Sequence, residues 1–126
     1  MMLVMSGPPP VGALAVARGY HDAWQRRDYR AAWQLLSDDL TVEVPVNSYD
    51  SKAAFAEAAQ RTREMAAAVT PLAEFGNDGE AVLIYDLTLP IGDLRIAEYF
   101  RVSGGRITQI THIHDTAALR AAGAGP

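Results

Sequence analysis

The stretch EAVLIYDLTLPIGDLRIAEYFRVSGGRITQITHIHD, residues 80–115, consists of three apolar runs divided by the turn signals PIGD and SGG. The last run alternates apolar with polar residues, which is the period of a strand with one buried face. Turns rich in Gly, Pro, Asp or Ser join neighbouring antiparallel strands, and NDG at 77–79 marks another such turn. These signals predict an antiparallel meander with strands over 80–89, 94–102 and 106–115.

Helical periodicity dominates the residues before the meander. Apolar side chains recur at spacings of three and four in 13–27, and again in 29–37 after Asp28, a favourable N-cap. A longer run with the same period spans 51–69 and ends before Pro71. We expect a helix over each of these three segments.

Residues 40–46, LTVEVPV, alternate with period two and predict a strand between the second and third helices. Helices followed by an antiparallel meander indicate an α+β domain. To bury one of its faces, the sheet has to curl over the long helix at 51–69. We therefore expect an α+β barrel, in which a cone-shaped, curved antiparallel β-sheet wraps around that helix and two shorter helices precede it.

Length and composition limit the classes of protein that the chain can belong to. The 126 residues suffice for one domain with a real core. Apolar residues make up 49% of the chain and charged residues 21%, which is an ordinary globular composition. A net charge of -4 without a local Lys/Arg cluster argues against a nucleic-acid partner. Because the chain has no cysteine, disulfides, thiolate metal sites and cysteine nucleophiles are excluded.

The opening MMLVMSGPPP has no positively charged start, and its apolar run is too short for a signal peptide or a membrane span. We expect residues 1–11 to be a disordered tail, 12–117 to form the domain, and 118–126 to be a C-terminal tail with at most one helical turn. On this interpretation the protein is cytoplasmic and has no membrane partner.

His112 and His114 lie two positions apart in the last predicted strand. This spacing sends both imidazoles to the same face of the strand, roughly 6.5 Å apart. Alternation alone does not decide whether that face lines a cavity, since each face of the strand carries isoleucine.

Two longer segments resemble a known group of proteins. GYHDAWQRRDYRAAWQLLSDDLTVEVP (19–45) is similar to the opening helices and first strand of ketosteroid isomerases and SnoaL-like polyketide cyclases. EYFRVSGGRITQITHIHD (98–115) is similar to their paired last strands. Together with the order of predicted elements, these segments make the chain resemble the nuclear transport factor 2-like superfamily. That superfamily holds isomerases, cyclases, dehydratases, epoxide hydrolases and non-catalytic binders, so the fold that it implies does not fix the function.

The resemblance to the isomerases gives two residues a catalytic role and shows that a third catalytic residue of the isomerases is missing here. Tyr20 matches the tyrosine that donates a hydrogen bond to the developing enolate, and Glu98 matches its acidic partner. The position of the general-base aspartate is occupied by Val44, which cannot move a proton. The match therefore argues against steroid-type isomerisation by that mechanism, and any base has to lie elsewhere.

The resemblance also implies which face of the last strand lines a cavity. The cavity face is expected to carry Ile110, His112 and His114, which leaves Ile107, Gln109, Thr111 and Ile113 for the sheet exterior or a dimer contact. The rest of an apolar cavity for a small molecule would be formed by Tyr20, Trp24, Val42, Val44, Phe55, Leu83, Tyr85, Leu87, Ile96, Glu98 and Phe100. His21 lies about 100° around the first helix from that face and is expected at the surface.

Glu98 and His112 are the candidate acid–base pair. Adjacent antiparallel strands would place them about 5 Å apart, close enough for the carboxylate to orient the imidazole and raise its basicity. Such a histidine can shuttle protons near neutral pH. The alternatives are that Glu98 is a buried acid paired with an arginine, that the histidines lie at a solvated mouth, and that Tyr20 is an ordinary core aromatic.

Other chemistries of the superfamily fit less well. His112, His114 and Glu98 would suit Fe(II) or Zn(II), but neighbouring histidines on one strand cover only one edge of a coordination sphere, and we expect no metal and no cofactor. The Asp-Arg-Asp set of limonene-type epoxide hydrolases is not met, since Arg95 and Arg101 alternate away from Glu98. A site like that of scytalone dehydratase, with two histidines and tyrosines, fits the residue types better, although no position-by-position match can be made.

The sequence thus predicts a cofactor-independent SnoaL-like enzyme that abstracts a proton beside a carbonyl of a hydrophobic polyketide-, terpenoid- or steroid-like substrate. Cyclisation, isomerisation or dehydration would follow. His112 is the expected base or acid, Glu98 its orienting partner and Tyr20 the oxyanion donor, while His114 and Tyr85 would position the substrate. The alternative is a non-catalytic domain of the same fold, which binds a small ligand or forms a homodimer through its sheet.

Overall fold

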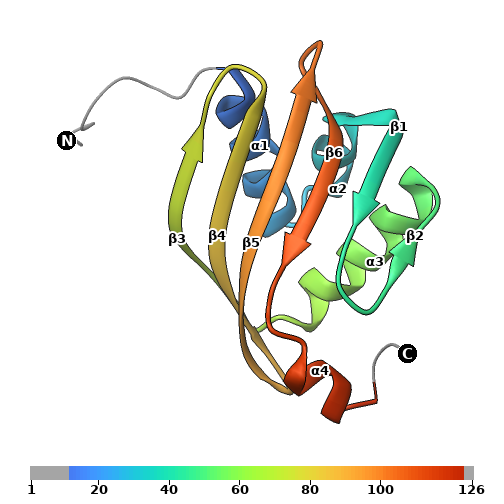
Figure 1. The fold of residues 1–126 in the computed structure, drawn as a ribbon, viewed down its shortest axis with the longest axis vertical. Helices are drawn as coiled ribbons and strands as arrows, with labels where there is room; N and C mark the ends of the chain where they lie inside the picture. Colours follow the sequence, from blue (N-terminus) through green and yellow to red (C-terminus); the bar gives the residue numbers. More distant parts are fainter. Residues whose placement is uncertain (1–11, 124–126) are drawn as a thin grey trace.

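Six strands form one curved sheet in the computed structural model, which describes residues 12–123 (Figure 1). The strands are β1 (Leu36–Glu43), β2 (Ser48–Tyr49), β3 (Ala68–Gly76), β4 (Glu80–Leu89), β5 (Gly92–Ser103) and β6 (Arg106–Ile113). The helices are α1 (Gly12–Gln25), α2 (Tyr29–Gln34), α3 (Lys52–Met65) and α4 (Ala117–Ala121). The predicted N-terminal tail, 1–11, lies outside the described residues, as does the end of the predicted C-terminal tail, 124–126.

The strands are hydrogen-bonded in the order β2-β1-β6-β5-β4-β3. Neighbouring strands are antiparallel except for β1 and β6, which run parallel. Figure 1 shows α1, α2 and α3 behind the sheet, on its inner side. This arrangement confirms the predicted α+β fold with a curved sheet, and the parallel pair is its departure from the all-antiparallel sheet that we expected.

None of the helices formed by residues 12–123 is long and apolar enough to cross a membrane.

Backbone signals separate the two N-terminal helices and the first strand. Arg27, between α1 and α2, has a left-handed φ of 63°, which a helix interior does not contain. Asp28 caps α2 as predicted, because its carboxylate accepts a hydrogen bond from the N–H of Ala31. α2 ends before the predicted position 37, since the buried Leu36 already belongs to β1.

α3 begins as predicted and ends early. Ser51 is its N-cap, and the hydroxyl accepts a hydrogen bond from a backbone N–H of the first turn. The prediction that this helix continues to Val69 is wrong, because α3 ends at Met65 and Val69 lies in β3. Val69 and Thr70 are β-branched and favour a strand, and Pro71 is tolerated because β3 is an edge of the sheet.

A β-bulge at Thr108 changes which residues of β6 point inward. Ile107 and Gln109 pair with consecutive residues of β5, so Thr108 between them has no partner in the register. The bulge turns Ile107 into the core, where it is 0% exposed, whereas Ile113 is 63% exposed. The prediction that Ile107 lies on the sheet exterior is therefore wrong.

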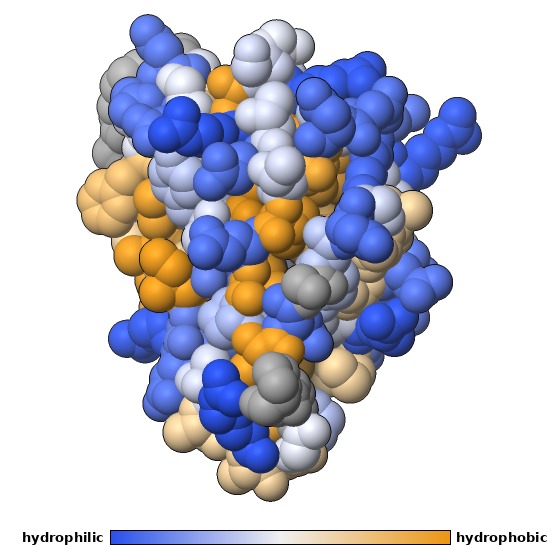
Figure 2. Space-filling model, turned by 45° about the vertical axis from the view of Figure 1, so that its right-hand side comes forward, coloured by the Kyte–Doolittle hydropathy of each residue, from blue (hydrophilic) through white to orange (hydrophobic). Residues whose placement is uncertain are grey.

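The outward face of the sheet carries many apolar side chains. Residues directly opposite each other on neighbouring strands point to the same side, and two such rows cross this face. One row is Phe75, Val82, Tyr99 and Thr111, and the other is Ala73, Ile84, Ala97 and Ile113. Figure 2 shows apolar side chains among hydrophilic ones on this side of the molecule.

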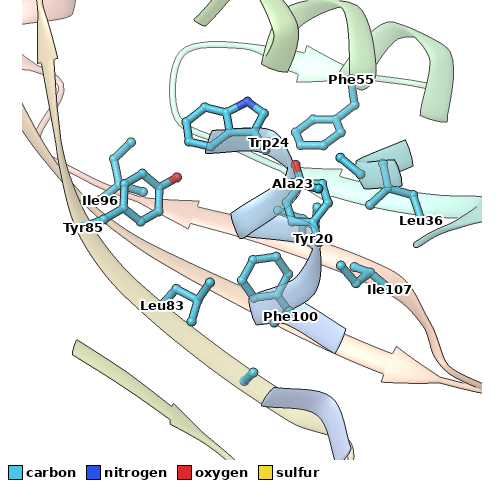
Figure 3. Packing of buried hydrophobic residues seen from close by; sticks show 14 of the residues in the cluster. Tyr20, Ala23, Trp24, Leu36, Phe55, Leu83, Tyr85, Ile96, Phe100 and Ile107 are labelled. Atoms are coloured by element: carbon cyan, nitrogen blue, oxygen red, sulfur yellow. The ribbon is translucent and has the colours of Figure 1, made fainter. Parts of the chain in front are cut away.

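The core lies between the inner face of the sheet and the helices. α1 packs on β4 and β5, and α3 lies against β1 and α1. In Figure 3, Tyr20 of α1 lies close to Phe100 of β5, and their ring centroids are 5.9 Å apart. The largest fully buried side chains belong to this core, namely Phe100, Leu36, Leu87, Ile107 and Ile110.

Candidate active site

A cavity of about 250 Å³ opens between the inner face of the sheet, α1 and α3. It is lined by Tyr20, His21, Trp24, Val44, Pro45, Val46, Asn47, Tyr49, Phe55, Ala58, Ala59, Thr62, Met65, Tyr85, Leu87, Leu89, Leu94, Ile96, Glu98, His112, His114 and Leu119. Most of these side chains are apolar, and the polar ones include a carboxylate and three imidazoles. A concave apolar space with a few convergent polar groups is typical of sites for small molecules.

The structure brings ten of the predicted site residues to the wall of this cavity. They are Tyr20, Trp24, Val44, Phe55, Tyr85, Leu87, Ile96, Glu98, His112 and His114. Four others are not on the wall, since Leu83, Phe100 and Ile110 are buried in the core and Val42 packs against it. Phe100 and Ile110 do point to the inner side of the sheet. The resemblance therefore identified their face but not their depth in the cone.

Other parts of the wall were not predicted from the sequence. Tyr49 belongs to the short strand β2, for which the sequence analysis predicted no element, and its ring meets Phe55 edge-on. Leu89 and Leu94 come from the hairpin between β4 and β5. Leu119 comes from α4, so a residue beyond position 117, where the sequence predicts the domain to end, also takes part in the cavity wall.

Glu98 lies at the centre of a row of polar side chains. Its side chain is 3% exposed. The Tyr85 hydroxyl donates a hydrogen bond to Glu98 Oε1 over 2.8 Å. His112 Nε2 lies 3.0 Å from Glu98 Oε2, without the geometry of a hydrogen bond. These contacts exist because β4, β5 and β6 are neighbours and Glu98 stands directly opposite His112 in the register.

The partners of Glu98 decide its ionisation. Burial raises the pKa of this carboxyl, but the nearby His112, then His21, and the hydrogen bond from Tyr85 together outweigh burial and hold the pKa below its ordinary value. Glu98 is therefore a buried carboxylate that keeps its negative charge near neutral pH.

Two tyrosine hydroxyls lie near this carboxylate. Burial raises the pKa of Tyr20 and of Tyr85 well above the ordinary value, and the charge of Glu98 raises both further. Both side chains therefore stay protonated and can act as hydrogen-bond donors. In Figure 3 the Tyr85 hydroxyl points toward Tyr20 and Trp24, and the Tyr20 hydroxyl toward Phe55. The Tyr85 hydroxyl donates its hydrogen bond to Glu98, whereas Tyr20 makes no hydrogen bond to another described side chain.

His21 is the residue that the sequence analysis placed wrongly. It is 4% exposed and lines the cavity, although we expected it at the surface. Its ring lies 4.3 Å from that of Tyr85 and 5.1 Å from that of Trp24, centroid to centroid. The spacing of Ala13, Ala17, His21 and Trp24, at four, four and three residues, was the available signal, because it is one helical stripe.

His112 and His114 have different surroundings. His112 belongs to β6, whereas His114 follows the end of that strand, and its Nδ1 lies 3.0 Å from the backbone oxygen of Asp115. Among residues 12–123, no group of three or more His, Cys, Asp or Glu side chains is placed to hold a metal ion. His112, His114 and Glu98 thus do not form the ligand set that the sequence left open.

Comparisons with solved structures support the fold. A protein from Kribbella flavida DSM 17836 is 29% identical and superimposes with a TM-score of 0.82, over 88% of this chain and 93% of that one. A steroid delta-isomerase from Pseudomonas aeruginosa is 18% identical, with a TM-score of 0.76 over 94% of this chain and 90% of that one. A candidate polyketide cyclase from Sinorhizobium meliloti is 18% identical, with a TM-score of 0.69 over 79% of this chain and 94% of that one. At 18% identity the last two show the fold alone.

The sequence itself assigns the family. No curated protein sequence matches the chain. Residues 17–110, however, match the family model of the SnoaL-like domain. This match runs from α1 into β6 and includes Tyr20, Tyr85 and Glu98. The chain therefore belongs to the SnoaL-like family of the nuclear transport factor 2-like superfamily.

Proposed function

We propose that this protein is an enzyme that moves a proton beside the carbonyl group of a small hydrophobic molecule, without a cofactor. The observation that carries the proposal is Glu98, a buried carboxylate that accepts a hydrogen bond from Tyr85 and lies beside His112 in an apolar cavity. Ionisable groups with shifted pKa values in a cleft are candidates for acid–base catalysis.

His112 is the proposed base. His112 Nε2 lies 3.0 Å from Glu98 Oε2, and with the proton of the neutral imidazole on Nε2 the lone pair is on Nδ1. His112 takes a proton from the carbon next to the carbonyl: the C–H bond breaks and an N–H bond forms at Nδ1. The electron pair of the C–H bond forms the C=C bond of an enolate, and the π electrons of the carbonyl move to its oxygen. The charge of Glu98 stabilises the imidazolium that forms.

The product depends on the next step of the enolate. Return of the proton to a different carbon completes an isomerisation. Attack of the enolate carbon on a second carbonyl of the same molecule closes a ring, and departure of a β-hydroxyl group, which takes the proton from His112 and leaves as water, completes a dehydration. His112 acts as acid in each of these steps, so the enzyme returns to its starting state.

Tyr20 is the proposed donor to the developing oxyanion. Its hydroxyl makes no hydrogen bond to another described side chain, and it lines the cavity. Preorganised donors in an apolar site stabilise a developing negative charge more than donors in water do. Tyr85 lines the cavity and also holds Glu98 in place through its hydrogen bond. His114 lies on the wall beyond β6 and would position the substrate there.

The side chains of the cavity wall indicate the class of substrate. A ring of aliphatic and aromatic side chains favours a hydrophobic, oxygenated molecule of polyketide, terpenoid or steroid type. Val44 lies on the wall at the position where the isomerases carry their base. This residue favours ring closure or dehydration over the isomerisation of steroids.

A non-catalytic binding domain is the second candidate, because the same cavity could hold a ligand without changing it. The two candidates differ in whether a proton next to a carbonyl is exchanged. A base in the cavity would speed this exchange in any ketone that fits, even one that the enzyme does not convert further.

The test uses 2-tetralone, a bicyclic ketone with acidic protons beside its carbonyl, in D₂O. Proton NMR measures how fast these protons are replaced by deuterium, with and without protein. We expect the wild-type protein to accelerate the exchange, and His112→Ala to lose about 10²-fold of this acceleration. Tyr99→Phe, on the outward face of the sheet, is the control and should leave the exchange rate unchanged.

Two results would contradict the proposal. If the wild-type protein binds 2-tetralone without accelerating exchange, the chain is a binder. If His112→Ala keeps the full rate, the base lies elsewhere in the cavity.

A further inference from the structure

His21 stands in the same row of contacts as the proposed acid–base pair. His112 Nε2 lies 3.0 Å from Glu98, Glu98 accepts a hydrogen bond of 2.8 Å from Tyr85, and the Tyr85 ring lies 4.3 Å from the His21 ring. The row therefore has an imidazole at each end. His112 is accounted for by the proposed function, whereas His21 has no role in it.

The hydrogen bonding of His21 fixes its tautomer. The side-chain amide nitrogen of Gln25, one turn further along α1, lies 2.9 Å from His21 Nδ1. An amide nitrogen is a donor, so Nδ1 accepts, and the proton of the neutral imidazole is on Nε2. Gln25 thus presets which nitrogen of His21 donates.

The charge state of His21 agrees with this tautomer. Burial lowers the pKa of the imidazole below its ordinary value, against the attraction of Glu98 and Asp22, and His112 lowers it further. His21 is therefore neutral near neutral pH, with one N–H to give.

That N–H has no acceptor among residues 12–123. His21 Nε2 is buried, and no described residue makes a hydrogen bond with it. A buried donor without a partner costs folding free energy, and native structures seldom keep one without a reason. His21 forms part of the cavity wall, so an acceptor atom of a ligand bound there would give this N–H the partner that it lacks.

We propose that His21 is a neutral hydrogen-bond donor to the ligand, which gives its Nε2–H to a carbonyl oxygen of the molecule in the cavity. This inference deepens the proposed function and rests on it. A neutral imidazole with a preset tautomer suits this role, because it polarises a carbonyl without giving up its proton. The ligand class narrows accordingly to hydrophobic compounds with a carbonyl oxygen within reach of His21.

The first experiment compares 2-tetralone with tetralin, a hydrocarbon of nearly the same shape that has no oxygen. Binding is followed by the quenching of tryptophan fluorescence, since Trp24 lines the cavity. We expect His21→Phe, which keeps an aromatic ring, to weaken the binding of 2-tetralone about fivefold and to leave that of tetralin unchanged. A merely structural role of His21 would change both affinities alike, and that result would overturn the inference.

The second experiment needs no substitution at His21, so a folding defect in His21→Phe cannot obscure the answer. Long-range ¹H–¹⁵N NMR of the histidine side chains reports which nitrogen carries the proton. We expect His21 to be the Nε2–H tautomer at pH 7, its Nε2 signal to move when 2-tetralone binds, and Gln25→Met to give a mixture of tautomers. A protonated His21, a proton on Nδ1 or an unchanged Nε2 signal would each overturn the inference.

The two proposals fail in different ways. If 2-tetralone binds and responds to His21 but its protons do not exchange faster, the proposed catalysis fails and the donor role stands for a binding domain. If exchange is accelerated and His21→Phe keeps the preference for 2-tetralone over tetralin, only the donor role fails. If 2-tetralone does not bind at all, both proposals are wrong.

Discussion

Tyr85 and Tyr99 make the same kind of hydrogen bond in two different environments. Each hydroxyl donates to a glutamate on a neighbouring strand, Tyr85 to the buried Glu98 and Tyr99 to Glu80 on the outward face. Water can replace a lost partner at Glu80 but not at Glu98. The cost of removing the hydroxyl therefore depends on where the acceptor lies.

We expect Tyr85→Phe to lower the free energy of unfolding by about 1–3 kcal/mol, because it leaves a charged, buried acceptor without a donor. Tyr99→Phe should change it by about 0.5 kcal/mol or less. Urea unfolding at pH 7 measures both variants. If both variants lost the same free energy of unfolding, Glu98 would be hydrated in solution.

The ionised Glu98 also predicts how stability depends on pH. Its pKa is lower in the folded protein than in the unfolded chain, where it is about 4.3. The carboxylate thus stabilises the fold above pH 4.3, and this contribution disappears as the pH falls through the lower, folded-state value. We expect the difference in unfolding free energy between wild type and Glu98→Gln to be largest at neutral pH and to shrink in acid.

Urea unfolding between pH 3 and 7 checks this dependence. Glu57→Gln is the control, since the Glu57 side chain on α3 is 77% exposed, and its difference from wild type should be nearly independent of pH. A difference for Glu98→Gln that also stays constant would show that Glu98 is not held ionised.

At the scale of the element, β6 shows what a single extra residue does to a strand. Without a bulge, Ile107 and Ile113 would share one face, as the sequence analysis assumed. With the bulge at Thr108, Ile107 is buried and Ile113 is exposed. The two isoleucines therefore report directly on the register of β6.

We expect Ile107→Ala to lower the free energy of unfolding by about 2–5 kcal/mol, because it leaves a cavity in the core. Ile113→Ala should change it by about 0.5 kcal/mol or less if the protein is compared as a monomer. Chemical unfolding at low protein concentration measures both. A small loss for Ile107→Ala would argue that β6 pairs in the unbulged register.

The elements differ in how well the sequence predicts them. Capping residues such as Asp28 and Ser51 act within one turn, so the starts of α2 and α3 could be predicted. The end of α3 could not, because its apolar period continues into β3, where pairing with β4 decides the structure. The parallel pairing of β1 with β6 and the bulge at Thr108 depend on contacts distant in sequence, and no local pattern marks them.

The same limit applies to the candidate site. Glu98 and His112 could be expected on one face only through the resemblance to the isomerases, because an unbulged hairpin would place Glu98 opposite Thr111, and the bulge at Thr108 brings His112 there instead. The burial of His21 was missed because α1 packs between the sheet and α3 and buries a wider arc than a surface helix, so a second stripe of α1 besides that of Tyr20 faces the core. The wall formed by Tyr49 and Leu119 depends on short elements with little periodicity.

At the scale of the whole molecule, the outward face of the sheet remains to be explained. Phe75 and Ile113 are exposed at 62% and 63%, and both lie in the apolar rows that cross this face. Exposed apolar patches on a soluble protein often mark an interface. We keep the prediction that a second copy of the chain covers this face in a homodimer.

Sedimentation velocity over a range of concentrations tests this prediction. We expect the wild-type protein to sediment as a dimer and Ile113→Glu to shift it toward the monomer, because a carboxylate would be buried at the contact. Ile91→Glu is the control, since Ile91 is 41% exposed in the turn between β4 and β5, away from the two rows. A wild-type monomer at all concentrations would rule the homodimer out.

The parallel contact between β1 and β6 affects how the chain can fold while the ribosome synthesises it. β1 is made early, and its long neighbour is made last, after β3, β4 and β5. Until β6 leaves the exit tunnel, both β1 and β5 have a free edge, and Leu36 and Phe100 lack the strand that covers them. The nascent chain therefore carries the open edge of β1 through most of its synthesis, and its final fold is reached in a late step in which β6 joins β1 to β5.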